Sequence, residues 1–251
     1  MTIADTGFFS RWARLAWGAY AWLVFAAIVT GALLGVLLLP GLDRRRRWAR
    51  ACARSFFVGT RIPVTETGFE KIPDGHCIVV ANHASYLDGV IMQAYLPARF
   101  SFVIKSEVQR VPVMHFLLRR VGSRFVERFT AAASARDARS LLKAASAGES
   151  LAVFPEGTFI ATPGLGRFRP GAFASAIKGA IPLVPVAING SRAILPPTTL
   201  WPQRKPLCIT VLDPVDPGDH AYSSSAALAA VARERILEVL DEPDLLAAPA
   251  R

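Results

Sequence analysis

A histidine and an aspartate with a spacing suited to acid–base chemistry lie in the segment NHASYLD, residues 82–88, directly after the apolar run CIVVA. Histidine is the usual general base near neutral pH, and a carboxylate beside it fixes the imidazole tautomer and stabilises the imidazolium. On a regular helix, side chains five residues apart point about 140° away from each other. We therefore expect His83 in a strand-to-helix turn and Asp88 in the first helical turn, where the two can meet. The alternative is a helix-capping aspartate beside a loop histidine that does no chemistry.

Three further segments extend this pattern. FPEGT, residues 154–158, follows a second apolar strand and offers a carboxylate, a flexible backbone and a hydroxyl at one strand end. GSRFVER at residues 122–128 and VPVAING at residues 184–190 complete a set of four segments. Each segment alone is compatible with an ordinary turn. The four segments in this order therefore indicate a function more strongly than any one of them does.

Together the four segments resemble the sequence blocks of the glycerolipid acyltransferases, in particular the 1-acylglycerol-3-phosphate O-acyltransferases. The resemblance covers residues 60–215, and NHASYLD and FPEGT are its specific parts. It implies transfer of a fatty acyl group from acyl-CoA or acyl carrier protein to the free hydroxyl of a lysophospholipid at the membrane. The first acceptor it suggests is 1-acylglycerol-3-phosphate, which would give phosphatidate. It also implies that neither a metal nor an organic cofactor is needed.

Carried over residue by residue, the resemblance makes His83 the general base and Asp88 the residue that orients it. The acceptor oxygen would then attack the thioester directly, without an acyl-enzyme. Arg128 matches the basic residue expected to hold the acceptor's phosphate, which suits a guanidinium fork. Lys105 resembles a lysine near the thioester or the phosphate, with a solvated strand-end lysine as the alternative. The implied substrate-binding residues are Asn82, Lys105, Arg128, Glu156, Gly157, Thr158 and Arg169.

One residue departs from the family's pattern. Phe159 follows FPEGT, where many phosphatidate-forming members have arginine or serine, so a phosphate-binding arginine is missing there. Arg167 or Arg169, in a stretch that resembles F-K-x-G-A-F, could compensate. The acceptor therefore stays open between 1-acylglycerol-3-phosphate, another lysophospholipid and a lyso-aminolipid such as lyso-ornithine lipid.

Two other functions are compatible with the same residues. A membrane-tethered esterase or thioesterase would use His83 with Ser85 and release the acyl group without an acceptor. The sequence around Ser85 lacks the G-x-S-x-G elbow expected of a serine nucleophile on an α/β sheet. A non-catalytic lipid-binding scaffold would need none of His83, Asp88 and Glu156. The oligomeric state stays open.

Positioning these segments requires strands and helices that alternate along the chain after residue 60. Apolar runs predict strands at 77–81, 100–105, 124–127, 151–154, 183–188 and 207–212, and helices at 88–96, 112–121, 131–147, 170–179 and 223–241. This alternation predicts an α/β fold with a mixed, mostly parallel sheet flanked by helices. We assign residues 61–243 to an acyltransferase domain and residues 244–251 to a flexible tail.

Residues 1–60 form a separate, membrane-anchoring segment in this interpretation. Leu15–Leu39 carries no charge, and a helix of this length reaches about 37 Å, more than the ~30 Å hydrocarbon core of a bilayer. Tryptophan and tyrosine side chains gather near its N-terminal side, as at a membrane interface. We predict a transmembrane helix, with a re-entrant or monotopic hairpin and a buried core helix as alternatives. A cleaved signal peptide is disfavoured because the run ends in PGLDRRRR.

The positive charge of the chain is concentrated in the same segment. Of the net +10, residues 1–60 carry eight arginines against two aspartates. Arg44 to Arg47 lie in a predicted amphipathic helix at 43–58, and the positive-inside rule places them, with the catalytic body, at the cytoplasmic face of the cell (inner) membrane. Anionic headgroups would attract them by ~1 kcal/mol per residue. We expect no nucleic-acid partner, because no recognition element accompanies the charge. Three scattered cysteines exclude a disulfide framework and a zinc ribbon.

Overall fold

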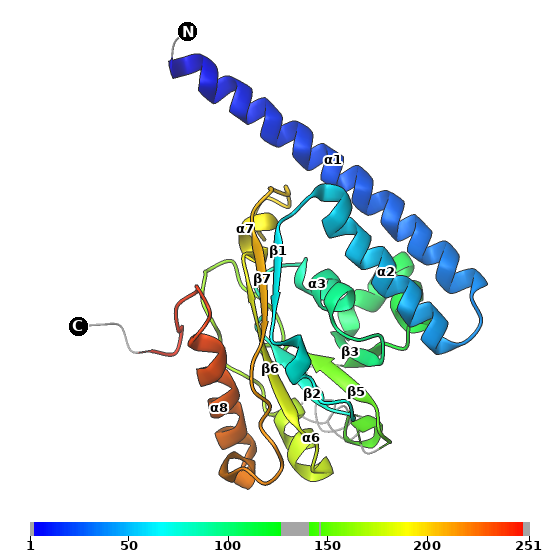
Figure 1. Ribbon diagram of the computed structural model, residues 1–251, viewed down its shortest axis with the longest axis vertical. Helices are drawn as coiled ribbons and strands as arrows, with labels where there is room; N and C mark the ends of the chain where they lie inside the picture. The colour runs from blue at the N-terminus through cyan, green and yellow to red at the C-terminus, as the bar shows by residue number, and fades with distance from the viewer. Residues whose placement is uncertain (1–2, 127–140, 146, 248–251) are drawn as a thin grey trace.

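The computed structural model describes residues 3–126, 141–145 and 147–247, with side chains from residue 11 onward. Within these residues, seven strands form one sheet in the order β1-β7-β6-β2-β5-β3-β4. The strands are β1 (Val64–Thr67), β2 (Ile78–Ala81), β3 (Phe100–Lys105), β4 (Arg124–Val126), β5 (Ser150–Val153), β6 (Leu183–Asn189) and β7 (Leu207–Val211). Strands β6 and β7 are antiparallel, and the other neighbouring pairs are parallel. The predicted mixed, mostly parallel sheet is confirmed (Figure 1).

Helices cover both faces of the sheet. The described helices are α1 (Ile3–Leu38), α2 (Leu42–Thr60), α3 (Asp88–Tyr95), α4 (Pro112–Arg120), α6 (Gly171–Gly179), α7 (Ser191–Ile194) and α8 (Ser225–Leu237), with 3-10 helices η1 (Phe69–Lys71), η2 (Ser106–Arg110) and η3 (His220–Ser223). Helices α2 and α3 lie on one face, with α1 packed outside α2, and α6 and α8 lie on the other (Figure 1). The result is an α/β layered architecture.

Strand β2 lies at the centre of the sheet and is buried on both faces. Val79 and Ala81 pack in the core under α2 and α3, whereas Ile78 and Val80 pack in the core under α6 and α8. A strand enclosed by two helical layers needs apolar side chains on both faces, which explains the continuous apolar run that precedes NHASYLD. The site therefore begins at the end of a rigid strand.

All six predicted strands are present, and one strand was missed. β1 has the sequence VTET, with Val64 half-buried and the next three side chains exposed. It lies at the edge of the sheet, where one face needs no apolar side chains. Its sequence therefore lacks the apolar run from which the other strands were predicted. The predicted helices at 88–96, 112–121 and 170–179 match α3, α4 and α6, and the predicted helix at 223–241 contains α8 and extends beyond it. The predicted helix at 131–147 falls mostly outside the described residues, although 141–145 are helical.

The residues after α8 correct our expectation of a flexible tail from residue 244. The Asp244 carboxylate pairs with Arg233, and the backbone of Leu245 bonds to Leu165 O. Leu165 and Asp244 also form a parallel β-bridge. The first residues of the expected tail are therefore part of the folded body.

Helix α1 packs against the rest of the protein along one side only, although its apolar residues are not confined to that side. Its buried or half-buried side includes Trp17, Gly18, Ala21, Val24, Phe25, Ile28, Ala32, Gly35 and Val36. Tyr20 donates a hydrogen bond to Gly59 O at 2.9 Å, and Trp48 of α2 donates one to Gly31 O at 2.9 Å. Between Leu15 and Leu38, the remaining side of α1 is exposed and largely apolar. Because only one stripe is covered, α1 is not a buried core helix.

Candidate active site

His83 and Asp88 meet as their spacing predicted. His83 lies in the turn after β2, and Asp88 is the first residue of α3. The distance from His83 Nδ1 to Asp88 Oδ2 is 2.8 Å. The same oxygen accepts hydrogen bonds from the backbone N–H groups of Ala84 at 2.7 Å and Ser85 at 2.8 Å. Asp88 is fully buried, whereas the His83 side chain is 17% exposed.

This arrangement determines how the imidazole can act. Asp88 Oδ2 already accepts two backbone N–H groups, so it is also the acceptor toward His83, whose Nδ1 then carries the donated proton. The second ring nitrogen, Nε2, is then left as the basic atom of the neutral imidazole. A buried carboxylate in this position also stabilises the imidazolium that forms when Nε2 takes a proton. The pair is thus built for general-base chemistry.

Aromatic side chains enclose the His83 ring. Phe154, directly after β5, stacks on it with ring centroids 4.3 Å apart, and Phe159 contacts it edge-on with ring centroids 4.8 Å apart. The Phe159 ring also contacts Tyr86 at 4.6 Å. Sequence reasoning singled out Phe159 only as a departure from the family's pattern and missed this contact. A low-dielectric surrounding strengthens the electrostatic interaction between His83 and Asp88.

Glu156 connects FPEGT to the histidine segment. Its Oε1 accepts a hydrogen bond from the His83 backbone N–H at 2.8 Å, and its Oε2 accepts one from Gly166 N–H at 2.9 Å. Burial raises the pKa of the Glu156 carboxyl above its ordinary value, against the opposing effect of these two N–H donors and of His83. Gly157 follows with φ +85°, a conformation that favours glycine. The contacts give Glu156 a role in holding the His83 backbone.

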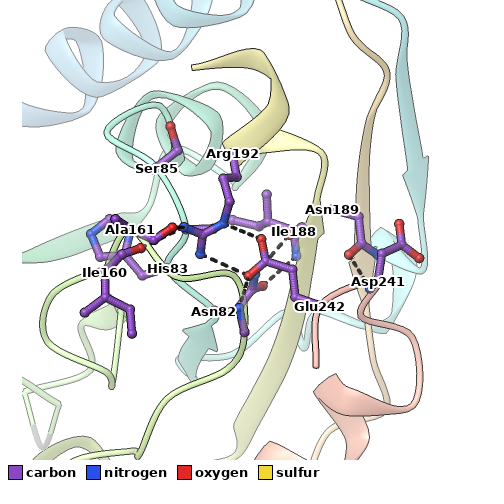
Figure 2. Close-up of polar contacts among 12 residues, drawn as sticks. Asn82, His83, Ser85, Ile160, Ala161, Ile188, Asn189, Arg192, Asp241 and Glu242 are labelled. Atoms are coloured by element: carbon purple, nitrogen blue, oxygen red, sulfur yellow. Dashed lines mark hydrogen bonds and ion pairs between the residues drawn. The ribbon is translucent and has the colours of Figure 1, made fainter. Parts of the chain in front are cut away.

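Asn82 joins two neighbouring strands. Its side-chain amide donates to Ile188 O at 2.9 Å and accepts from Ile188 N–H at 2.7 Å (Figure 2). Asn82 is 2% exposed, and both polar atoms of its side chain are engaged by β6. The structure therefore assigns it to fixing the end of β2 rather than to contact with a substrate.

The other expected residues that the structure describes lie at or near the same edge of the sheet. Because β2, β5 and β3 are parallel neighbours, the turns after β2 and β5 and the half-buried Lys105 at the end of β3 share one edge. Thr158 and Arg169 are exposed, and the Arg169 backbone N–H bonds to Pro155 O at 2.8 Å. Arg128 lies outside the described residues. Among the described residues, no cluster of three His, Cys, Asp or Glu side chains could hold a metal ion.

Ser85 is directed away from this chemistry. It is fully buried, and its hydroxyl donates to Leu195 O at 2.8 Å and accepts from Leu87 N–H at 3.2 Å. Figure 2 shows its oxygen pointing away from the imidazole. A serine nucleophile needs its hydroxyl within reach of the base, and this hydroxyl is engaged elsewhere.

Comparisons with known proteins show similarity to acyltransferases. A family model described as Acyltransferase matches residues 63–189. A chloroplastic 1-acyl-sn-glycerol-3-phosphate acyltransferase of Brassica napus is 28% identical over 180 residues, which cover 67% of this chain and 52% of that protein. The lyso-ornithine lipid O-acyltransferase of Pseudomonas aeruginosa is 30% identical over 166 residues, 63% of this chain and 60% of that protein. The chain thus spans about half the length of several curated relatives that it matches.

A solved structure shares the fold. The crystal structure of the 1-acyl-sn-glycerophosphate (LPA) acyltransferase PlsC from Thermotoga maritima matches with a TM-score of 0.75 at 23% identity, covering 91% of this chain and 95% of that one. The family model spans half of the chain, from the start of β1 to the end of β6, and includes the turns that carry His83, Asp88 and Glu156. The chain belongs to the Acyltransferase family.

Proposed function

We propose that this protein is a membrane-bound O-acyltransferase that moves a fatty acyl group from acyl-CoA or acyl carrier protein to the free hydroxyl of a lysophospholipid. The leading acceptor is 1-acylglycerol-3-phosphate, and the product is then phosphatidate. The observation that carries the proposal is the contact of His83 with the buried Asp88 at 2.8 Å in an aromatic surrounding. Membership of the Acyltransferase family supports the same reaction class.

The reaction follows from the geometry of this pair. His83 Nε2 takes the proton of the acceptor hydroxyl while the oxygen attacks the carbonyl carbon of the thioester. The C–O bond of the new ester forms, the C–S bond breaks, and the departing thiolate takes the proton from the imidazolium. Asp88 holds the tautomer and stabilises the imidazolium between these two steps. Ser85 takes no part, because its hydroxyl is bonded to Leu195 O.

The exposed side of α1 supports attachment to a membrane. Leu23, Leu34, Leu37 and Leu38 are 54–76% exposed, and α1 is, among the described residues, the one helix long and apolar enough to cross a bilayer. The opposite stripe of α1 packs on the body from Trp17 to Val36. A helix that crossed the bilayer would meet lipid all round, so this packing favours the monotopic alternative, in which one side of α1 lies in the cytoplasmic leaflet.

A second acceptor class has its own supporting observation. Phe159, and not a cation, stands edge-on to His83 and Tyr86. One relative is named a lyso-ornithine lipid O-acyltransferase. An aromatic side chain at this point is compatible with a headgroup that carries no phosphate, so lyso-ornithine lipid is the alternative acceptor.

One assay separates these functions. The full chain in vesicles is given acyl-CoA with no acceptor, with 1-acylglycerol-3-phosphate, with other lysophospholipids or with lyso-ornithine lipid, and products are identified by mass spectrometry. We expect ester product only when an acceptor is present, and none from His83→Ala. His220→Ala is the matched control, because the His220 side chain is 93% exposed and lies outside the site. Release of free fatty acid without acceptor would indicate a thioesterase, and absence of any turnover a scaffold.

A further inference from the structure

The loop that follows FPEGT is held by the C-terminal residues of the chain. Leu165 N–H donates to Pro243 O at 2.8 Å, and Leu245 N–H donates back to Leu165 O at 3.2 Å. Gly164 N–H donates to Glu242 Oε2 at 2.7 Å. We call residues 157–166 the FPEGT loop. Its contacts connect a segment next to His83 with residues beyond α8.

Arg192 of α7 joins the FPEGT loop to this C-terminal segment. Its Nε and Nη2 donate to the two carboxylate oxygens of Glu242 at 2.6 and 3.0 Å. Its Nη1 donates to Ile160 O at 2.7 Å and to Ala161 O at 3.1 Å. Figure 2 shows the guanidinium between the carboxylate and these two carbonyls. The ion pair is well shielded, with side chains 13% and 19% exposed, and bidentate pairs of this kind fix geometry as well as adding energy.

Two further side chains hold the partners of this ion pair in place. The Asn189 amide donates to Val239 O at 2.7 Å and accepts from Asp241 N–H at 2.9 Å (Figure 2), which fixes the chain directly before Glu242. Arg233 of α8 pairs with Asp244 and donates to Gly166 O at 3.1 Å. The C-terminal segment is therefore anchored on both sides of Glu242.

The FPEGT loop in turn positions the candidate base. Phe159, which contacts the imidazole, immediately precedes the two carbonyls that Arg192 holds. Gly166, at the other end of the loop, donates to Glu156, whose second oxygen holds the His83 backbone N–H. A loop displaced at Ile160 or Gly164 would release both contacts of His83.

We propose that Arg192 and Glu242 are positioning residues of the active site: their ion pair fixes the FPEGT loop so that Phe159 and Glu156 hold His83 in its working orientation. Neither residue touches the reacting atoms. Both lie outside the segment matched by the family model, residues 63–189. The catalytic part of this inference rests on the proposed function, whereas the fixing of the loop and of the imidazole does not.

The test compares Glu242→Gln and Arg192→Lys with wild type in the full chain. Gln keeps the shape of Glu242 without its charge, and Lys cannot reach the carboxylate and two carbonyls at once. Glu66→Gln is the matched control, because it breaks an arginine–glutamate pair at 2.6 Å between α2 and β1, away from the loop. Thermal unfolding first establishes that each variant is folded at the assay temperature.

Three readouts decide the proposal. In both variants we expect faster hydrogen exchange at residues 157–166 and faster carbethoxylation of His83 by diethyl pyrocarbonate, with Glu66→Gln unchanged. Because a misplacement of about 1 Å away from the chemistry can cost about 10²-fold in rate, we expect kcat to fall by about 10- to 100-fold, with KM for acyl-CoA almost unchanged.

The outcomes separate this proposal from the proposed function. Unchanged loop exchange and unchanged His83 modification in folded variants would overturn the positioning role, whatever the activity. A wild-type protein with no acyl transfer would contradict the proposed function, while the two chemical readouts would still decide the role of the ion pair. If a smaller folded fraction accounted for the entire loss in kcat, the ion pair would have only a structural role, and the positioning role would be overturned.

Discussion

At the scale of single residues, one carboxylate oxygen of Asp88 accepts three hydrogen bonds. Besides His83 Nδ1, it accepts the backbone N–H groups of Ala84 and Ser85, so the turn and the imidazole share one anchor. A change at Asp88 therefore affects both the tautomer of His83 and the conformation of the turn. This coupling explains why the two residues can be five positions apart and still act together.

The first prediction concerns this pair. We expect His83→Ala to lose about 10²–10⁴-fold in rate, because the base that takes the acceptor's proton is removed, while acyl-CoA binding stays nearly intact. Asp88→Asn should lose a similar factor, because the amide no longer fixes Nδ1 as the donor. The measurements are kcat at saturating substrates and acyl-CoA affinity by calorimetry. More than about a tenth of the wild-type rate in His83→Ala would contradict the general-base role.

The second prediction concerns Ser85. Direct transfer predicts that Ser85→Ala keeps most of its activity and that no acylated protein accumulates when acceptor is withheld. The lost hydrogen bond to Leu195 O lowers the free energy of unfolding by about 1 kcal/mol. Kinetics and intact-mass spectrometry check the two parts. An acyl adduct on Ser85 would favour the esterase mechanism instead.

At the scale of elements, the parallel order of β2, β5 and β3 explains how much of the site could be predicted. The turns after β2 and β5 had to share an edge once both strands were recognised as buried and parallel. The contact between Arg192 and Glu242 could not be predicted, because it joins residues 50 apart through the path of the chain after α8. A solvated arginine and a buried one look alike in a sequence.

The C-terminal segment gives the third prediction. The side-chain hydrogen bond from Arg233 holds the pKa of Asp244 at about 2, below its ordinary value of 3.8. A carboxyl with a lowered pKa contributes stability that is fully present above its unfolded pKa and is lost as pH falls through its folded pKa. We expect Asp244→Asn to be less stable than wild type near neutral pH, with the difference shrinking between about pH 4 and pH 2.

The check is denaturant unfolding of both proteins at a series of pH values. Asp213→Asn is the control. Lys71 also lowers the pKa of Asp213, but that aspartate lies on the exposed surface away from the C-terminal segment. A stability difference for Asp244→Asn that does not change with pH would show that the ion pair with Arg233 is not its cause.

At the scale of the whole molecule, the arginines at 44–47 have two different roles. Arg46 is 8% exposed and donates to Val121 O, to Arg99 O and to the Ser101 hydroxyl. Burial lowers its pKa. Arg44 and Arg47 are exposed, so they remain available to anionic headgroups. Substitution of the entire run would therefore weaken the attraction to the membrane and destabilise the fold at the same time, so the two effects could not be told apart. The sequence pattern alone did not distinguish Arg46 from the other arginines of the run.

The last prediction concerns the uncovered side of α1. Replacing Leu23, Leu34 and Leu37 with Gln leaves the buried stripe intact but removes apolar surface, and each fully buried leucine contributes about 1.5–3 kcal/mol when it leaves water. We expect this variant to shift from the membrane to the soluble fraction. Its rate on a long-chain lysolipid in vesicles should fall more than its rate on a short, water-soluble analogue, because attachment keeps the site at the depth of lysolipid hydroxyls. The same three positions changed to Met form the control, which stays apolar. Equal loss on both acceptors, or membrane retention of the Gln variant, would contradict the role of this face.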